Sequence, residues 1–372
     1  MIDLPVPPGF LSLGQPVARR SARQAIERGR ASRTLLVHGP AGSNKDRFVD
    51  DLLAMLFCSE VDQAHRPCNA CRGCRDGRAR SHPDLVVGSP DAWREDRASA
   101  ESIVAAARRW LLEGAGAPVV ADRRVILIER ADRASEQIQN TLLKALEEPT
   151  DRHAYILVAD EARKLLPTIR SRCQPLRIGA VPHDELTAHL MDTIPLPEDQ
   201  ATALVRISGG MAGTAEAYAR EPALLDWRRR VQAELLTLLE RGRADRFGSV
   251  RDLLDEASRT TPSSAEAGEP DAEGRRTPAS VQRDAAIRIV EVWIALTRDL
   301  LVAEAGRPDL APSRELAPEL VVRAGSIGIA PLLHMASFLD RVHGGLRENT
   351  APRLALEAAM LAWPMLPRQP DP

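Results

Sequence analysis

Three short apolar runs in the first half of the chain constrain its fold more than any other feature. They fall within residues 33–38, 124–128 and 154–158, and the last two do not alternate with polar side chains. Continuous runs of this kind are typical of parallel strands that helices cover on both faces. A Gly-Pro-Ala-Gly turn leads from the first run into a helical apolar pattern over 46–56, and a second helical pattern separates the other two runs. The sequence therefore predicts an α/β domain built on a parallel sheet.

Helical patterns fill most of the remaining chain. From residue 181 to 256 the apolar spacing is helical and is interrupted by a glycine turn over 208–213, which predicts a small helical domain. Residues 258–279 are rich in Ser, Thr, Pro, Gly, Ala and Glu, as in a flexible insertion. Two apolar stripes beyond this segment predict a terminal helical bundle. The stripes consist of Ile287, Val290, Ile294 and Leu301 and of Leu354, Leu356, Met360 and Leu361.

The overall charge argues against a protein that grips nucleic acid alone. The 372 residues include 50 basic and 52 acidic side chains, so the chain has no strong positive field to attract phosphates. Its first residues have neither the basic start nor the apolar core of a signal peptide, and no run approaches about 18 continuous apolar residues. We therefore expect a soluble, cytoplasmic protein that shares any work on DNA with partners.

Four cysteines give the strongest chemical signal. Cys58, Cys68, Cys71 and Cys74 are spaced C-x9-C-x2-C-x2-C, and four thiolates this close together suit one tetrahedral Zn²⁺. A disulfide pair or reduced structural thiols are the alternatives, but the segment between the cysteines is polar and no secretion signal is present. His65 and His82 are less favoured substitute ligands. With four protein ligands the zinc site would be structural and not catalytic.

Arginines surround the cysteine segment. They are expected either to offset the negative charge of the cluster or to form a solvated basic loop, and they are Arg66, Arg72, Arg75, Arg78 and Arg80. A zinc-dependent nucleic-acid-binding protein would use such a loop. The near-neutral total charge and the absence of interleaved aromatic residues argue against an independent site of that kind.

A phosphate-binding loop follows the first predicted strand, but two of its positions are changed. A working loop reads G-x-x-x-x-G-K-[ST], whereas this chain retains Gly39, Gly42 and Lys45 and has Asn44 and Asp46 at the last glycine and hydroxyl positions. A side chain at the glycine position hinders the backbone amides from closing around phosphate. A carboxylate at the hydroxyl position lies beside anionic phosphates instead of ligating magnesium as a hydroxyl does. We therefore expect this loop to be inactive in ATP binding.

The end of the second predicted strand has a similar defect. Glu129 keeps a carboxylate where a magnesium ligand is needed, but Arg130 occupies the place of the carboxylate that would polarise the attacking water. Guanidinium stays protonated and cannot act as a base. Asp132 is displaced along the chain and is better explained as a residue that begins a helix. Hydrolysis of ATP within this chain is therefore not expected.

Three motifs, in this order, connect the sequence to a known family. They are Glu-Arg-Ala-Asp at 129–132, Asn-Thr-Leu-Leu-Lys-Ala-Leu-Glu-Glu-Pro at 140–149 and Leu-Leu-Pro-Thr-Ile-Arg-Ser-Arg-Cys at 165–173. The motifs resemble those of the AAA+ clamp-loader subunits of bacterial DNA polymerase III. The resemblance implies that the motif Ser171, Arg172 and Cys173 supplies an arginine finger, Arg172, to ATP on an adjacent subunit.

Departures from the family pattern favour the delta-prime subunit over the ATP-hydrolysing gamma/tau subunit. Ala159 stands where hydrolysing relatives have a sensor hydroxyl, and Thr214 stands where an ATP-sensing arginine is expected. Delta-prime relatives keep the Ser-Arg-Cys motif and the zinc cysteines without these elements. The resemblance therefore implies a subunit of the DNA polymerase III holoenzyme that has no ATPase activity of its own.

The resemblance also implies domains and partners. The domains are an AAA+ domain over 1–178 with a zinc-binding insertion at 58–74, a helical lid over 179–223, and a helical collar over 224–372 that contains the insertion 258–279. The implied partners are the gamma/tau and delta subunits, with the sliding clamp and primed DNA in the assembled complex. An ATP-hydrolysing gamma/tau-like subunit and a zinc-dependent nucleic-acid-binding protein are the alternatives.

Overall fold

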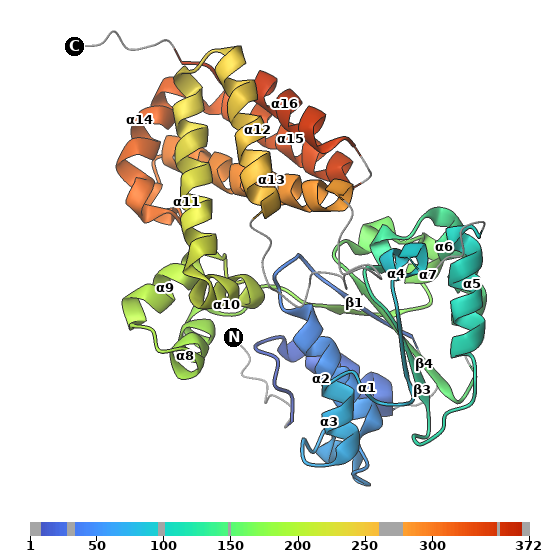
Figure 1. Ribbon diagram of the computed structural model, residues 1–372. Helices are drawn as coiled ribbons and strands as arrows, with labels where there is room; N and C mark the ends of the chain where they lie inside the picture. The colour runs from blue at the N-terminus through green and yellow to red at the C-terminus, as the bar shows by residue number, and fades with distance from the viewer. Residues whose placement is uncertain are drawn as a thin grey trace. The chain divides into compact units, whose positions relative to one another are not determined.

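The computed structural model describes residues 9–27, 34–95, 101–147, 150–259, 278–347 and 350–366 (Figure 1). The chain forms two compact units, Met1–Glu216 and Ala217–Pro372. The finer division into 1–178, 179–223 and 224–372 stays a prediction.

A parallel sheet forms the centre of the first unit. Within the described residues it has five strands in the order β2-β3-β4-β1-β5. The strands are β1 (Thr34–His38), β2 (Leu85–Gly88), β3 (Arg124–Ile128), β4 (His153–Ala159) and β5 (Gln174–Arg177). The three apolar runs form β1, β3 and β4, which confirms the parallel α/β fold class. The apolar pattern does not predict β2 and β5, because these edge strands are short and partly exposed.

Helices cover both faces of the sheet (Figure 1). In chain order, the helices up to residue 220 are α1 (Pro16–Glu27), α2 (Lys45–Phe57), α3 (Arg72–Arg78), α4 (Pro90–Glu95), α5 (Ile103–Gly114), α6 (Glu136–Glu147), α7 (Pro167–Arg170), α8 (His183–Thr193), α9 (Glu198–Ile207) and α10 (Ala212–Arg220). Leu35 and Val37 of β1 pack in one apolar cluster with α1 and α2, whereas Leu36 packs in another with helices α4 to α7. Each such buried side chain contributes about 1.5–3 kcal/mol, so a run that is apolar throughout stabilises both layers.

The carboxyl ends of β1, β3 and β4 meet at one edge of the sheet. His38 at the end of β1 pairs with Ala159 of β4, and Ile128 at the end of β3 pairs with Leu157. The amide of Gly39 donates to the carbonyl of Ala159 at 3.2 Å. The loops that carry the phosphate-loop and carboxylate motifs therefore lie at the same end of the sheet, on either side of the end of β4.

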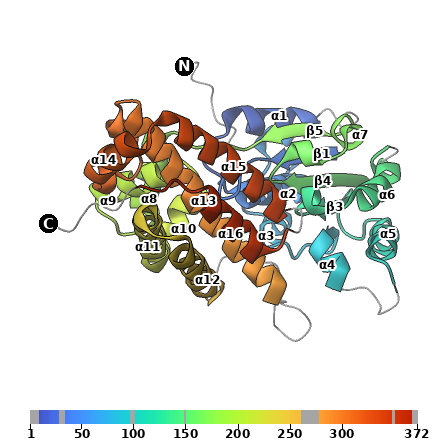
Figure 2. The ribbon, with the colours of Figure 1, turned by 90° about the horizontal axis from the view of Figure 1, so that it is seen from above.

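The second unit is helical throughout its described residues. It contains α11 (Pro222–Thr237), α12 (Arg243–Arg259), α13 (Pro278–Glu304), α14 (Ala317–Ile327), α15 (Ile329–Arg347) and α16 (Pro352–Ala362). Helix α13 packs against the other five, as Figure 2 illustrates for α15 and α16. Most of the predicted insertion, residues 260–277, lies outside the described residues.

The first predicted stripe of the bundle is confirmed and the second is partly wrong. Val290 is fully buried in the core of the second unit, and the other three members of its stripe pack against that core. In the second stripe Leu356 and Met360 are buried, but Leu354 and Leu361 are 65% and 56% exposed. Residues two apart on a helix lie about 200° apart, so Leu354 cannot share the face of Leu356.

Helices α14 and α15 are apolar but short. Within the described ranges, no single helix is both long enough and apolar enough to cross a membrane. Residues Arg314–Ile327 and Ile329–Arg347 meet that criterion only as a pair, and they are bent by 102° at their junction. Part of their apolar character is used in the bundle core, where Leu320 and Leu332 are fully buried.

A buried carboxylate fixes the loop between α5 and β3. Asp84, directly before β2, is fully buried and accepts hydrogen bonds from the backbone amides of Val119, Val120 and Ala121 at 2.5, 2.8 and 2.7 Å. Burial acts to raise the pKa of Asp84, but the three amide donors outweigh it and hold the pKa below its usual value. The charged carboxylate therefore stabilises this edge of the sheet.

We expect Asp84→Asn to lower the free energy of unfolding by about 1–3 kcal/mol at pH 7, because a neutral amide replaces a charged acceptor of three bonds. The native pKa of Asp84 lies below its value of about 3.9 in the unfolded chain. Its contribution to the free energy of unfolding is therefore fully present when the pH is above about 3.9, and it is lost as the pH falls through the lowered native pKa. Denaturant titrations should show a constant penalty between about pH 7 and 5 that shrinks below about pH 4. Asp122→Asn, an exposed substitution on the same loop, is the control, and an equal effect of both would contradict the assignment.

Candidate functional site

The four cysteines converge on one point. Their Sγ atoms all lie within 4.8 Å of one another. Cys58 follows the last residue of α2, Cys71 is the N-cap of α3, and Cys74 lies in the first turn of that helix. The described part of the chain therefore contains a Cys₄ group that could hold a metal ion.

Backbone amides are directed at these sulfur atoms. The amides of Cys68, Cys71 and Cys74 donate to the Sγ atoms of Cys58, Cys68 and Cys71 respectively, each at 3.4 Å. Burial acts to raise the pKa of the Cys71 thiol, but hydrogen bonds from Ser59 and Cys74 outweigh burial and lower the pKa to about 6. Donors of this kind favour thiolates, which are the form of cysteine that binds metals. Burial instead raises the pKa of Cys58 and of Cys74.

The two histidines near the cluster have other partners. The ring of His82 stacks on Phe57 at 3.7 Å between centroids, and its Nδ1 accepts from the amide of Asp84 at 3.1 Å. The side chain of His65 is 70% exposed and faces Asp62. Neither histidine belongs to the metal-ligating group found among the described residues.

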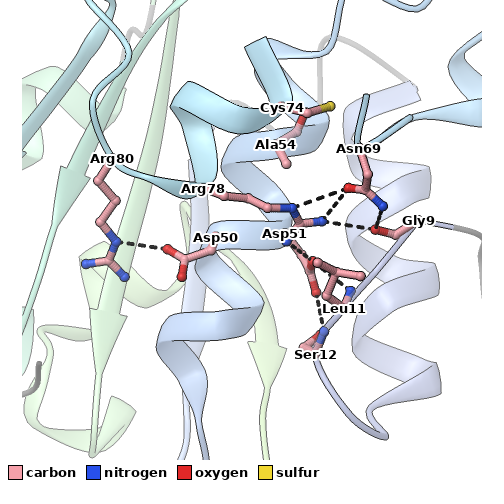
Figure 3. A network of polar contacts seen from close by, with 10 residues as sticks. All are labelled: Gly9, Leu11, Ser12, Asp50, Asp51, Ala54, Asn69, Cys74, Arg78 and Arg80. Atoms are coloured by element: carbon pink, nitrogen blue, oxygen red, sulfur yellow. Dashed lines mark hydrogen bonds and ion pairs between the residues drawn. The ribbon is translucent and has the colours of Figure 1, made fainter. Parts of the chain in front are cut away.

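Helix α3 is held closely against α2. A Cβ atom on Gly73 would lie 1.9 Å from the carbonyl oxygen of Phe57, so this contact requires glycine. Figure 3 shows the polar part of the contact, where Arg78 donates to the carboxylate of Asp51 at 2.5 Å and to the side chain of Asn69 at 2.7 Å. Packing and charge thus fix the cysteine segment on α2.

The same carboxylate also binds the N-terminal segment. Asp51 is fully buried, and its two oxygens accept from the amides of Leu11 and Ser12 at 2.9 and 2.8 Å. Arg78 and Asn69 both donate to the carbonyl of Gly9, at 3.0 and 2.8 Å (Figure 3). One buried anion therefore joins α2, α3 and the segment before α1.

The phosphate loop is covered from within the first unit. Gly42 has a φ of 74°, and a Cβ atom there would lie 2.0 Å from the hydroxyl oxygen of Thr214. Its carbonyl accepts from the amides of Gly213 and Thr214 at the start of α10, at 2.9 and 3.3 Å. Asn44 adopts a left-handed conformation, and its side chain donates to Glu216 at 3.4 Å. The start of α10 thus makes contact with the loop that would surround phosphates.

Lys45 is directed at protein atoms. Its ammonium group donates to the carboxylate of Asp160 at 2.8 Å and to the carbonyl of Pro40 at 3.1 Å, and its side chain is 8% exposed. A phosphate-loop lysine would instead reach a nucleotide's phosphates. Asp160, directly after β4, neutralises this charge in the structure.

A second cation lies among the loop carboxylates. The guanidinium of Arg80 pairs with Asp50 at 2.9 Å, with Asp46 at 3.4 Å and, at shorter range, with Glu129. Arg130 instead pairs with Asp91 at 3.3 Å. Sequence reasoning placed Arg80 beside the cysteines and did not find these carboxylate partners, because the pairings join segments far apart in the chain.

The remaining predicted residues lie at two places. Ala159 is buried, and Asp132 accepts from the amide of Glu161 at 3.0 Å, which is a structural role. Ser171 and Arg172 are exposed directly after α7, whereas Cys173 is buried in the apolar layer below. Among the described contacts of Arg172, none is with the phosphate loop of its own chain.

We expect Arg78→Ala to lower the free energy of unfolding by about 3 kcal/mol, because it leaves the buried Asp51 carboxylate without its cation. Arg72→Ala is the matched control on the same helix, since Arg72 is 87% exposed and its ion pair is with Asp76, one turn further along. Its effect should stay below about 1 kcal/mol. Thermal and urea unfolding would measure both; equal effects would argue against the Asp51 anchor.

Comparison with known proteins shows what the first part of the chain resembles. Residues 14–182 match the family model described as "DNA polymerase III, delta subunit". The delta-prime subunit of Escherichia coli is 29% identical over 197 residues, which are 51% of this chain and 55% of the relative. That of Bacillus subtilis is 30% identical over 162 residues, which are 44% of this chain and 46% of the relative. The chain thus spans about half the length of these curated relatives.

A gamma/tau subunit and a solved structure extend over more of the chain. The gamma/tau subunit of Mycobacterium bovis is 27% identical over 96% of this chain and 61% of its own length. The crystal structure of a DNA polymerase III gamma subunit-related protein from Thermotoga maritima is 17% identical, with a TM-score of 0.37 and coverage of 92% and 97%. By sequence, residues 14–182 are thus similar to the DNA polymerase III delta subunit family, and parts of the chain are similar to delta-prime and gamma/tau subunits.

Proposed function

We propose that this chain is a non-hydrolysing, delta-prime-like stator of a clamp loader and that it donates Arg172 to ATP bound on a neighbouring subunit. The observation that carries the proposal is the contrast between its cations. Lys45 and Arg80 are paired with carboxylates around the degenerate phosphate loop. Arg172 lies at the surface after α7, where its ion pair is with the half-exposed Glu147. The chain is thus equipped to act on a neighbour's nucleotide rather than on its own.

The local chemistry opposes hydrolysis in this chain. A loop-bound ATP would have to displace Asp160 from Lys45, and the carboxylates of Asp46 and Glu129 are already paired with Arg80. Arg130 cannot accept the proton of an attacking water. These features support a subunit that assembles without turning over ATP.

Arg172 is held weakly enough to be redirected. Its guanidinium pairs with the half-exposed Glu147 at 2.8 Å and donates to the carbonyl of Thr168 at 2.9 Å. Exposed ion pairs of this kind are worth only about 0–1 kcal/mol, so a neighbour's γ-phosphate can compete for the guanidinium. The buried Cys173 fixes the backbone from which the side chain projects.

We further propose that the Cys₄ group binds a structural zinc ion. The same proposal includes the gamma/tau and delta subunits as partners, loading of the sliding clamp onto primed DNA as the joint activity, and the cytoplasm as the location. Zinc would supply charge neutralisation for the four thiolates and connect the end of α2 to the start of α3.

We expect Arg172→Ala to slow ATP turnover by the reconstituted loader, in the presence of clamp and primed DNA, by about tenfold or more without preventing assembly, since a trans arginine stabilises transition-state charge. Arg172→Lys should also be slow, because an ammonium lacks the planar fork. Arg170→Ala, an exposed change two residues away, is the control. Unchanged turnover with Arg172→Ala, or turnover by the isolated chain, would contradict the proposal and favour a gamma/tau-like ATPase.

We expect the purified chain to carry one zinc ion and Cys74→Ser to lose it, with a lowered melting temperature, because metal binding contributes to folding. Cys173→Ser is the matched control: it also alters a buried cysteine, but one outside the cluster. It should destabilise the fold and keep the zinc. Metal analysis by mass spectrometry distinguishes the two, and equal zinc content in both variants would exclude the assigned ligands.

A further inference from the structure

Arg80 occupies a place where a working relative of this site needs a metal ion. In a phosphate-loop enzyme, magnesium is held by the hydroxyl that follows the loop lysine and by a carboxylate at the end of another strand of the sheet. Asp46 and Glu129 stand at those two positions here, and both contact the guanidinium of Arg80. Asp50, one turn along α2, adds a third carboxylate at 2.9 Å.

The charges of this group are strongly coupled. Burial acts to lower the pKa of Arg80, but Asp50, Glu129 and Asp46 outweigh it and raise the pKa above the usual arginine value. Burial raises the pKa of Asp50, against the influence of Arg80. Three carboxylates thus share one cation whose side chain is 28% exposed.

The backbone delivers Arg80 from the cysteine segment. Arg80 follows the end of α3 by two residues and adopts a φ of 53°, a conformation that non-glycine residues rarely adopt. Two residues earlier, Arg78 is fixed to Asp51 of α2. The position of Arg80 is therefore set by the docking of α3 and not by a freely moving side chain.

We propose that Arg80 is a built-in block that takes the place of the divalent cation at the phosphate loop and so keeps metal–nucleotide out of this subunit. The inference rests on the proposed non-hydrolysing role and names the residue that enforces it. With Arg80 present, a divalent cation would have to displace a guanidinium that is hydrogen-bonded to three carboxylates. Without it, the carboxylates have no cation and present hard oxygen ligands.

The test is a Mn²⁺ titration of the zinc-loaded chain, followed by electron paramagnetic resonance. Wild type and the exposed-arginine control Arg72→Ala should bind no Mn²⁺ at this cluster at Mn²⁺ concentrations below about 1 mM. Arg80→Ala and Arg80→Gln should each bind one Mn²⁺ at least about tenfold more tightly. Adding Glu129→Gln to Arg80→Ala should weaken this binding again by about tenfold, because one oxygen ligand loses its charge.

Two outcomes would overturn the proposal. One is a wild-type chain that binds Mn²⁺ as tightly as the Arg80 variants; the other is folded Arg80 variants that bind no more tightly than wild type. If both Arg80 variants are unfolded without added metal, Mn²⁺ should restore their circular dichroism spectrum and raise their melting temperature. Failure of Mn²⁺ to do so would also overturn the proposal. These measurements use the isolated chain, so their failure is distinguishable from failure of the Arg172 proposal, which is tested in the assembled loader.

Discussion

The buried carboxylate of Asp51 is the constraint on which the arrangement of the site depends. An unpaired charge in an apolar interior costs several kcal/mol, so a carboxylate with no exposed surface must be surrounded by donors. The donors come from the N-terminal segment and from Arg78. Satisfying one anion on α2 therefore also decides where the cysteine segment lies. That segment in turn places Arg80 among the carboxylates beside the phosphate loop.

Helix α2 connects the two candidate sites because it is short and its ends carry different chemistry. Its first residues, Lys45 and Asp46, belong to the phosphate loop, and Cys58 follows its last residue. Its apolar residues, such as Leu52 and Leu53, are fully buried, so the helix cannot shift without disturbing the core. A metal at the cysteines would stabilise α3 against this helix, and the same α3 places the cation that neutralises the loop carboxylates. The two sites are in this sense one structural unit.

The sequence predicted the features that depend on local pattern. Strands β1, β3 and β4 follow from continuous apolar runs, and the convergence of the cysteines follows from their spacing. Strands β2 and β5 were missed because an edge strand needs no continuous apolar run. The pairings of Arg80 with Glu129 and of Lys45 with Asp160 span 49 and 115 residues, and no local pattern encodes them. The sequence hint to these pairings was Asp46. A carboxylate at the hydroxyl position of the phosphate loop indicates that a cation lies nearby.

The proposed role of Arg172 depends on the buried residue that follows it. Burial raises the pKa of the Cys173 thiol to about 12, which keeps it neutral and suited to the apolar layer beneath β1 and β4. That packing fixes the chain at the start of β5, while Arg172, one residue earlier, is directed to the surface. An arginine finger gains from such an anchor, because a guanidinium whose backbone is already ordered loses less conformational entropy on reaching a phosphate. Under the proposed function, replacing Cys173 would weaken the stabilisation of a neighbour's phosphate indirectly, because it loosens the backbone that carries Arg172.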